Sequence, residues 1–236
     1  MSTATSWPRL SLGCGNFGGI GSAPAFFGQG ANEEQAFALM DAAVAAGIDW
    51  FDTADAYGGG ASERFIGNWR AERRPERLLL TTKLFHPVGE DPDDAGLSPS
   101  RIPRALEASL SRLRVERVEL LLAHEPDPHT PVGATIEAFE RLRERDLIGA
   151  WGLSNVDAQE LREALAHGRP ALVQNSYSLL ERDDERELLP LCAAEGIAYV
   201  PFGPLAGGWL TGKYRRGEPY PAGSRMTTLI SRSTSW

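Results

Sequence analysis

The chain has 236 residues, of which 42% are hydrophobic and 24% are charged, a composition typical of a globular protein with one large domain or two small ones. Its formal net charge is −8 with acidic and basic residues interspersed, which argues against nucleic acid or a polybasic membrane surface as a partner. The two cysteines, Cys14 and Cys192, are in no metal-binding spacing and no segment has the length of a membrane span, so we expect a cytoplasmic protein without membrane insertion.

Short apolar runs typical of strands alternate along the chain with longer segments of helical periodicity. In the first predicted helix, Phe37, Met40 and Val44 share one face and Asn32 is a suitable N-cap. The predicted strands are residues 9–13, 48–52, 77–83, 118–124, 149–155, 171–177 and 198–203. The predicted helices are residues 33–46, 61–69, 98–113, 133–146, 157–168 and 186–196.

This alternation predicts a parallel sheet with crossover helices, either doubly wound or closed as a (β/α)8 barrel. The first strand is followed by a long glycine-rich loop, GCGNFGGIGSAPAFFGQGANEE, rather than by the tight turn of a dinucleotide-binding domain. The sequence therefore favours the barrel. Because only seven strands of this kind can be counted, we expect one incomplete (β/α)8 barrel over residues 1–236, with an irregular or disordered tail at residues 218–236.

Four polar residues stand at or just after the ends of successive predicted strands: Asp52, Tyr57, Lys83 and His124. In a barrel these ends converge on one mouth. Each residue alone is common in loops and at strand ends, but together they suit a tuned proton donor. An ammonium beside a tyrosine lowers its pKa of about 10, and a carboxylate keeps that ammonium charged.

Such a donor would protonate an alkoxide that develops when hydride reaches a carbonyl carbon, and protein side chains supply no hydride. A nicotinamide cofactor is therefore implied. Ser154 and Asn155 end the fifth strand and Gln174 lies in the sixth, where hydroxyl and amide groups suit a carboxamide. Phe202, in the seventh strand, suits a stacked ring.

The stretches FDTADAYGGGASERFIG, LLLTTK, LLLAHEPD, GLSN, VQNSYSLL and PLAGGWLTGKY, in this order, closely resemble the aldo-keto reductase family. The resemblance implies an NADP(H)-dependent (β/α)8 barrel that reduces an aldehyde or ketone, with Asp52, Tyr57, Lys83 and His124 as its catalytic tetrad. It also implies that Ser154, Asn155 and Gln174 bind the carboxamide and that Phe202, where the family usually has tyrosine, stacks on the nicotinamide. The other cofactor-binding residues that it implies are Gly13, Cys14, Gly203, Pro204, Leu205 and Gly207.

The resemblance also implies an eighth strand and a loop that binds the adenosine 2′-phosphate beyond the matched stretches, and we expect this sequence to lack both. We therefore expect open barrel edges that favour self-association, and a reductase activity impaired by the missing part. Two alternatives remain open: a non-catalytic, cofactor-sensing barrel of the kind that serves membrane channels, and a metal-dependent hydrolase barrel. The ligands in the second alternative would be Asp52, Asp55, His86 and His124.

Overall fold

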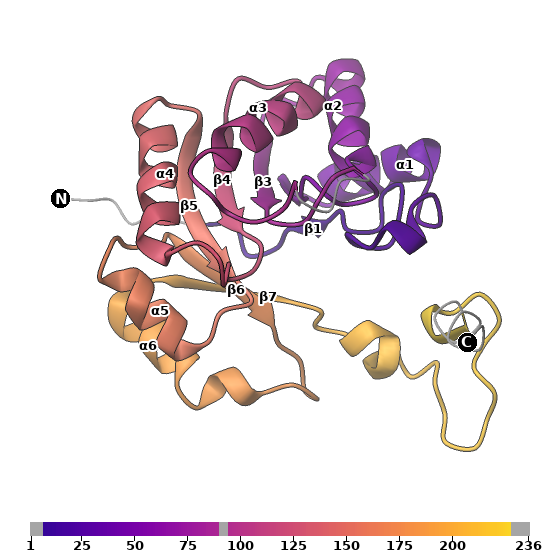
Figure 1. The fold of residues 1–236 in the computed structure, drawn as a ribbon. Helices are drawn as coiled ribbons and strands as arrows, with labels where there is room; N and C mark the ends of the chain where they lie inside the picture. Colours follow the sequence, from indigo (N-terminus) through magenta and orange to yellow (C-terminus); the bar gives the residue numbers. More distant parts are fainter. Residues whose placement is uncertain (1–6, 90–93, 228–236) are drawn as a thin grey trace.

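The computed structural model describes residues 7–89 and 94–227, which form one parallel sheet curled into an open barrel with helices on its outer side (Figure 1). The seven strands pair in chain order: β1 (Leu12–Gly13), β2 (Trp50–Asp52), β3 (Leu79–Leu84), β4 (Val118–Ala123), β5 (Ile148–Ser154), β6 (Leu172–Ser176) and β7 (Ala198–Phe202). The helices are α1 (Glu33–Ala45), α2 (Ala61–Arg73), α3 (Arg101–Leu113), α4 (Val132–Glu144), α5 (Ala158–Leu165) and α6 (Leu188–Glu195). Three short 3-10 helices are η1 (Pro24–Phe26), η2 (Asp183–Glu185) and η3 (Ala206–Thr211). The expected incomplete (β/α)8 barrel is confirmed.

The strands are apolar on both faces because each face packs against something. Alternate residues point into the barrel, where they form a small inner core of Trp50, Leu120, Leu122 and Leu172. Their neighbours, such as Phe51 and Leu121, belong to the larger core that includes apolar residues of the helices. Trp7 stacks on Trp50 with ring centroids 5.6 Å apart and extends the inner core.

Helix α1 shows how a local hydrogen-bonding pattern sets the start of a helix. Asn32 caps α1 by accepting a hydrogen bond from the Gln35 N–H at 2.9 Å, and the Gln35 side chain accepts from the Asn32 N–H. The buried residues of α1 are Ala36, Met40 and Ala43. Of the three residues predicted to share one face, Met40 is buried, Phe37 packs partly buried against the core and Val44 is 37% exposed.

Helix α2 extends to Arg73, beyond the predicted end at residue 69. Trp69 and Arg73 both donate to the Asp41 carboxylate on α1, at 2.7 and 3.1 Å, and this contact fixes an extra turn that periodicity did not indicate. Near the middle of α2, a Cβ added at Gly67 would lie 2.2 Å from the Arg112 carbonyl oxygen. The close packing of α2 on α3 therefore requires glycine at this position.

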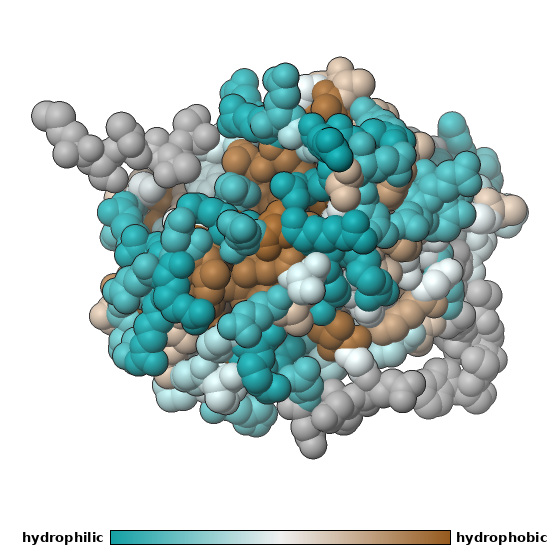
Figure 2. All heavy atoms as spheres, turned by 90° about the horizontal axis from the view of Figure 1, so that it is seen from above, coloured by the Kyte–Doolittle hydropathy of each residue, from teal (hydrophilic) through white to brown (hydrophobic). Residues whose placement is uncertain are grey.

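Among residues 7–89 and 94–227, β1 pairs only with β2 and β7 pairs only with β6. The segment after β7 runs through η3 away from the sheet (Figure 1). Of the predicted irregular tail, residues 218–227 contain only a short helical turn, and residues 228–236 lie outside the described part. Seen from above, the molecule presents hydrophilic side chains around a central area in which apolar side chains are visible (Figure 2). No helix in the described part of the chain has the length and apolar character needed to cross a membrane.

Candidate active site

The four residues predicted as a catalytic tetrad come together at the carboxyl ends of β2, β3 and β4. The Lys83 Nζ donates to the Asp52 carboxylate, to the Thr53 carbonyl at 2.9 Å and to the Tyr57 hydroxyl at 3.2 Å. The Nε2 atom of His124 lies 3.4 Å from the same hydroxyl. The Tyr57 hydroxyl is thus flanked by an ammonium and an imidazole.

Parallel pairing explains why these side chains meet. Asp52 at the end of β2 is in register with Thr81 on β3, so Lys83 stands beside the chain that leaves β2. That chain turns back through glycines with positive φ, and a Cβ at Gly58 (φ 58°) would lie 2.6 Å from the Phe17 carbonyl oxygen. Gly58 therefore allows the loop carrying Tyr57 to approach the first βα loop closely.

The charge on Lys83 is stabilised although its side chain is only 2% exposed. Burial lowers the pKa of Lys83, but the Asp52 carboxylate and the Tyr57 hydroxyl together outweigh it and raise the pKa above its ordinary value. Lys83 is therefore an ammonium at neutral pH, as its expected role requires.

The pKa of Tyr57 is higher than that of a free tyrosine. Burial raises this pKa more than the Lys83 ammonium lowers it, and the Asp52 carboxylate also raises it. We expected Lys83 to lower the Tyr57 pKa, and its contribution does have that direction. The net change in the free protein is nevertheless an increase, because burial outweighs it. Tyr57 therefore keeps its proton at neutral pH.

His124 is 8% exposed, and its pKa lies well below the ordinary value for histidine because of burial first, and then because of Lys83 and His86. The imidazole is therefore neutral at pH 7. Its Nδ1 atom has no hydrogen-bond partner among the residues that the structure describes. The ring of His86 meets the ring of His124 edge to face at a centroid distance of 4.9 Å.

A cleft of about 880 Å³ opens from the tetrad along the edges of β1 and β7. Of the predicted cofactor-binding residues, those that line it are Gly13, Ser154, Asn155, Gln174, Phe202, Gly203 and Pro204. Cys14, Leu205 and Gly207 do not line it. Cys14 is fully buried with its thiol directed at the Leu12 carbonyl, and Leu205 is 55% exposed.

Two of the predicted amide ligands are already engaged with the tetrad. Gln174 donates to the second oxygen of Asp52, and Asn155 donates to the His124 carbonyl at 2.9 Å and to the Ser154 hydroxyl at 3.2 Å. Sequence patterns assigned these residues only to the cofactor. Their hydroxyl and amide groups fit a carboxamide, and the half-exposed Phe202 ring at the rim of the cleft fits a stacked nicotinamide.

The structure also reveals site residues that the sequence analysis missed. Trp7, Arg9 and Trp50 line the cleft, and nothing in the local pattern distinguished them from ordinary strand residues. Behind the tetrad, Glu63 on α2 and Asp55, which the sequence analysis named only as a possible metal ligand, are completely buried. Both lie in the segment that follows β2, and the density of charged residues in that segment was the available signal.

The side chains named for a metal-dependent hydrolase have other partners. Asp52 binds Lys83, Asp55 faces Arg101 at 3.5 Å, and His86 contacts the Glu125 carboxylate at 3.2 Å. Within the described ranges, no group of three or more histidine, cysteine or acidic side chains is arranged to hold a metal ion.

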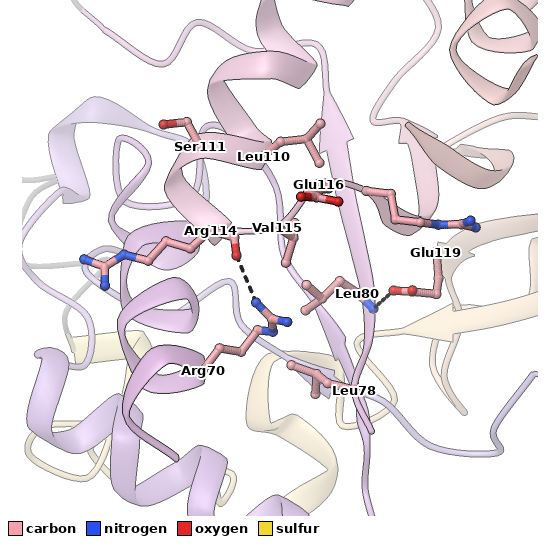
Figure 3. A pocket seen from close by; sticks show the side chains of 10 residues that line it. Arg70, Leu78, Leu80, Leu110, Ser111, Arg114, Val115, Glu116 and Glu119 are labelled. Carbon is pink, nitrogen blue, oxygen red and sulfur yellow. Dashed lines mark hydrogen bonds between the residues drawn. The ribbon is translucent and has the colours of Figure 1, made fainter. Parts of the chain in front are cut away.

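A second hollow, of about 560 Å³, lies at the amino ends of β3 and β4 (Figure 3). There Arg70 donates to the Arg114 carbonyl at 3.0 Å, and the Glu119 carboxylate accepts from the Leu80 N–H at 2.8 Å. The hollow contains no tetrad residue, and the opposite end of a barrel is where chemistry is performed.

The chain resembles known oxidoreductases over almost its whole length. The model of the aldo/keto reductase family matches residues 9–231. An uncharacterized oxidoreductase, YrpG of Bacillus subtilis, is 37% identical over 95% of this chain and 71% of its own length. The NADH-specific methylglyoxal reductase of Escherichia coli is 34% identical over 78% of this chain and 60% of its own length.

A solved aldo-keto reductase of Klebsiella pneumoniae, in complex with NADPH, superposes with a TM-score of 0.72. It is 27% identical to this chain, and the match covers 85% of this chain and 65% of that protein. The chain thus spans between 60% and 71% of the length of these relatives. Because the family model covers nearly the whole sequence and the fold agrees, the chain belongs to the aldo/keto reductase family of oxidoreductases.

Proposed function

We propose that this protein reduces an aldehyde or ketone to an alcohol with NADP(H), using Tyr57 as the general acid. The observation that carries the proposal is the Tyr57 hydroxyl, which stands between the Lys83 Nζ at 3.2 Å and the His124 Nε2 at 3.4 Å at the edge of the cleft. The Tyr57 hydroxyl, Lys83 and His124 all line this cleft, so a carbonyl oxygen bound in it would lie beside the proposed acid.

The roles follow from charge and geometry. A bound nicotinamide supplies hydride to the carbonyl carbon. Tyr57 holds its proton until negative charge develops on the substrate oxygen, because an alkoxide is a much stronger base than a phenolate. Lys83 stabilises the phenolate that remains, Asp52 keeps Lys83 charged, and neutral His124 orients the carbonyl oxygen.

Ser154, Asn155 and Gln174 are the residues that would hold the carboxamide, and Phe202 would stack on the ring. Ser154 is 1% exposed and Gln174 is 5% exposed, so their polar groups are held in fixed positions before any ligand binds. The bond from Gln174 to Asp52 links this group to the tetrad.

The first experiment is a titration of the purified protein with NADPH, followed by nicotinamide fluorescence, with NADH and a Tyr57→Phe variant as controls. Micromolar binding by both proteins, with carbonyl-dependent NADPH oxidation by the parent alone, supports the proposal. Oligomeric state is measured at the same concentrations by light scattering, since β1 and β7 are edge strands of the described sheet and such edges would favour self-association.

Three outcomes contradict it. Oxidation by the Tyr57→Phe variant at the parental rate removes Tyr57 from the general-acid role. Cofactor binding by the parent without turnover of any aldehyde or ketone favours a non-catalytic, cofactor-sensing protein. Absence of binding at millimolar cofactor, in a sample shown to be folded, removes the cofactor from the proposal.

A further inference from the structure

Arg101, in the first turn of α3, is a buried charge outside the tetrad with an unusual set of partners. Its side chain is 4% exposed. The guanidinium donates to the carbonyl oxygens of Asp94 and Gly96, each at 3.0 Å, and of His86 at 3.1 Å. These three acceptors lie in the two described parts of the β3–α3 loop, residues 85–89 and 94–100. One side chain therefore hydrogen-bonds to both ends of that loop.

The same guanidinium also faces the segment that carries the general acid. Its Nη2 atom lies 3.5 Å from the Asp55 carboxyl, two residues before Tyr57. Neither oxygen of Asp55 has a hydrogen-bond partner in the described part of the chain, and the Asp55 side chain is fully buried. The Asp55 N–H, in turn, donates to the Lys83 carbonyl at 3.0 Å, so the segment is also tied to β3.

The β3–α3 loop reaches the tetrad from the other side as well. The carbonyl that Arg101 binds at His86 belongs to the residue whose ring contacts the ring of His124. Arg101 thus contacts one segment that positions Tyr57 and another that positions His124. The planar guanidinium of arginine has five N–H groups and can contact the loop carbonyls and the Asp55 carboxyl at the same time. The smaller ammonium group of lysine cannot reproduce this set of contacts.

We propose that Arg101 is a positioning residue that locks the β3–α3 loop to the segment carrying Tyr57 and so fixes the distance between Tyr57 and His124. The catalytic consequence rests on the reductase function proposed above, but the coupling of the two segments does not. Arg112 provides a matched control: it lies on the same helix and pairs with the buried Glu63 at 2.7 Å, and no hydrogen bond or ion pair joins it to the described parts of the β3–α3 loop.

The test compares Arg101→Lys with Arg112→Lys by amide hydrogen exchange in the protein without ligands. For Arg101→Lys we expect at least about tenfold faster exchange in residues 53–58 together with residues 84–89 and 94–97, and no change in α4 to α6. For Arg112→Lys we expect changes confined to α2 and α3. Unchanged exchange in residues 53–58 of Arg101→Lys, or the same pattern in both variants, overturns the proposal.

Kinetics provide the second measurement. Displacement of the acid by about 1 Å can cost about 100-fold in rate, so we expect Arg101→Lys to lower kcat by about 10- to 100-fold while the Kd for NADPH changes less than about threefold. An equal loss of kcat in Arg112→Lys, or a parental kcat in Arg101→Lys, contradicts a positioning role. If the parent itself turns over no carbonyl compound, the proposed function fails, and the exchange measurement still decides the coupling.

A variant that does not fold would not end the test. Asp55→Ala leaves the three carbonyl contacts of Arg101 in place and removes only its contact with the Tyr57 segment. We expect this variant to speed exchange in residues 53–58 and not in residues 94–97. Parental exchange in residues 53–58 of Asp55→Ala overturns the proposal independently of Arg101→Lys.

Discussion

Replacing Lys83 with methionine tests the buried ion pair at the centre of the site. Lys83→Met keeps most of the side-chain volume but removes the ammonium that contacts the Asp52 carboxylate, the Thr53 carbonyl and the Tyr57 hydroxyl. Asp52 is 7% exposed, so in the variant its charge stays buried with Gln174 as its remaining hydrogen-bond donor. The change therefore affects stability and catalysis through different contacts.

The loss of stability in Lys83→Met can be estimated from the cost of leaving the Asp52 carboxylate without its charged partner. Removing one member of a buried ion pair costs about 3–5 kcal/mol, which is a large fraction of the roughly 5–15 kcal/mol that stabilises a typical domain. When both members are replaced by neutral residues this penalty disappears, so Lys83→Met combined with Asp52→Asn should unfold within about 2 kcal/mol of the parent. Neither variant restores an ammonium beside Tyr57, and we expect both to lose at least about 100-fold in kcat.

The assay is urea unfolding followed by tryptophan fluorescence, for which the buried Trp50 and Trp69 are suitable reporters, combined with carbonyl-dependent NADPH oxidation. The decisive comparison is between the single and the double variant. If Lys83→Met is as stable as the parent, or if the double variant is no more stable than the single one, the ion pair is not the origin of the cost. Recovery of activity in the double variant would refute the role of the ammonium.

Three further predictions concern neighbouring groups. Burial first, and then the nearby Glu63, raises the Asp55 pKa to about 8, so the parent loses stability relative to Asp55→Asn as pH rises from about 4 to about 8, by up to about 1.4 kcal/mol per pH unit; a constant difference in urea unfolding would contradict this. The low pKa of His124 predicts that its ring resonance in a proton NMR titration does not move between pH 8 and pH 6, whereas a midpoint near 6.5 would show an ordinary histidine. Gly67→Ala gains helix propensity but places a Cβ 2.2 Å from a carbonyl oxygen, so we expect a net loss of about 1–2 kcal/mol, visible as a lower Tm, and an unchanged Tm would show that α2 can shift away from α3.

Much of the fold could be predicted because each strand and helix carries its own signal. All seven strands and six longer helices occur within a few residues of their predicted positions. The greater length of α2 has a tertiary cause, because contacts of Trp69 and Arg73 with Asp41 extend the helix. This cause cannot be read from a local window of sequence.

Part of the candidate site could be predicted because the carboxyl ends of the strands in a barrel converge on one mouth. That rule brings Asp52, Lys83 and His124 together without knowledge of side-chain conformation. It says nothing about residues whose function depends on two loops at once, and Arg101 is such a residue: its partners at His86, Gly96 and Asp55 come from separate segments. Sequence periodicity placed it only at the start of a helix.

The net direction of the Tyr57 pKa shows why charge arguments from sequence are incomplete. The identities of the neighbours predicted a lowered value, but burial acts in the opposite direction and is larger. A tyrosine that holds its proton firmly in the free protein releases it only to a base stronger than itself, and a developing alkoxide is such a base. In the proposed reaction, the same burial that raises the pKa would delay proton transfer until hydride arrives, and the rate would depend on how the surrounding loops place Tyr57.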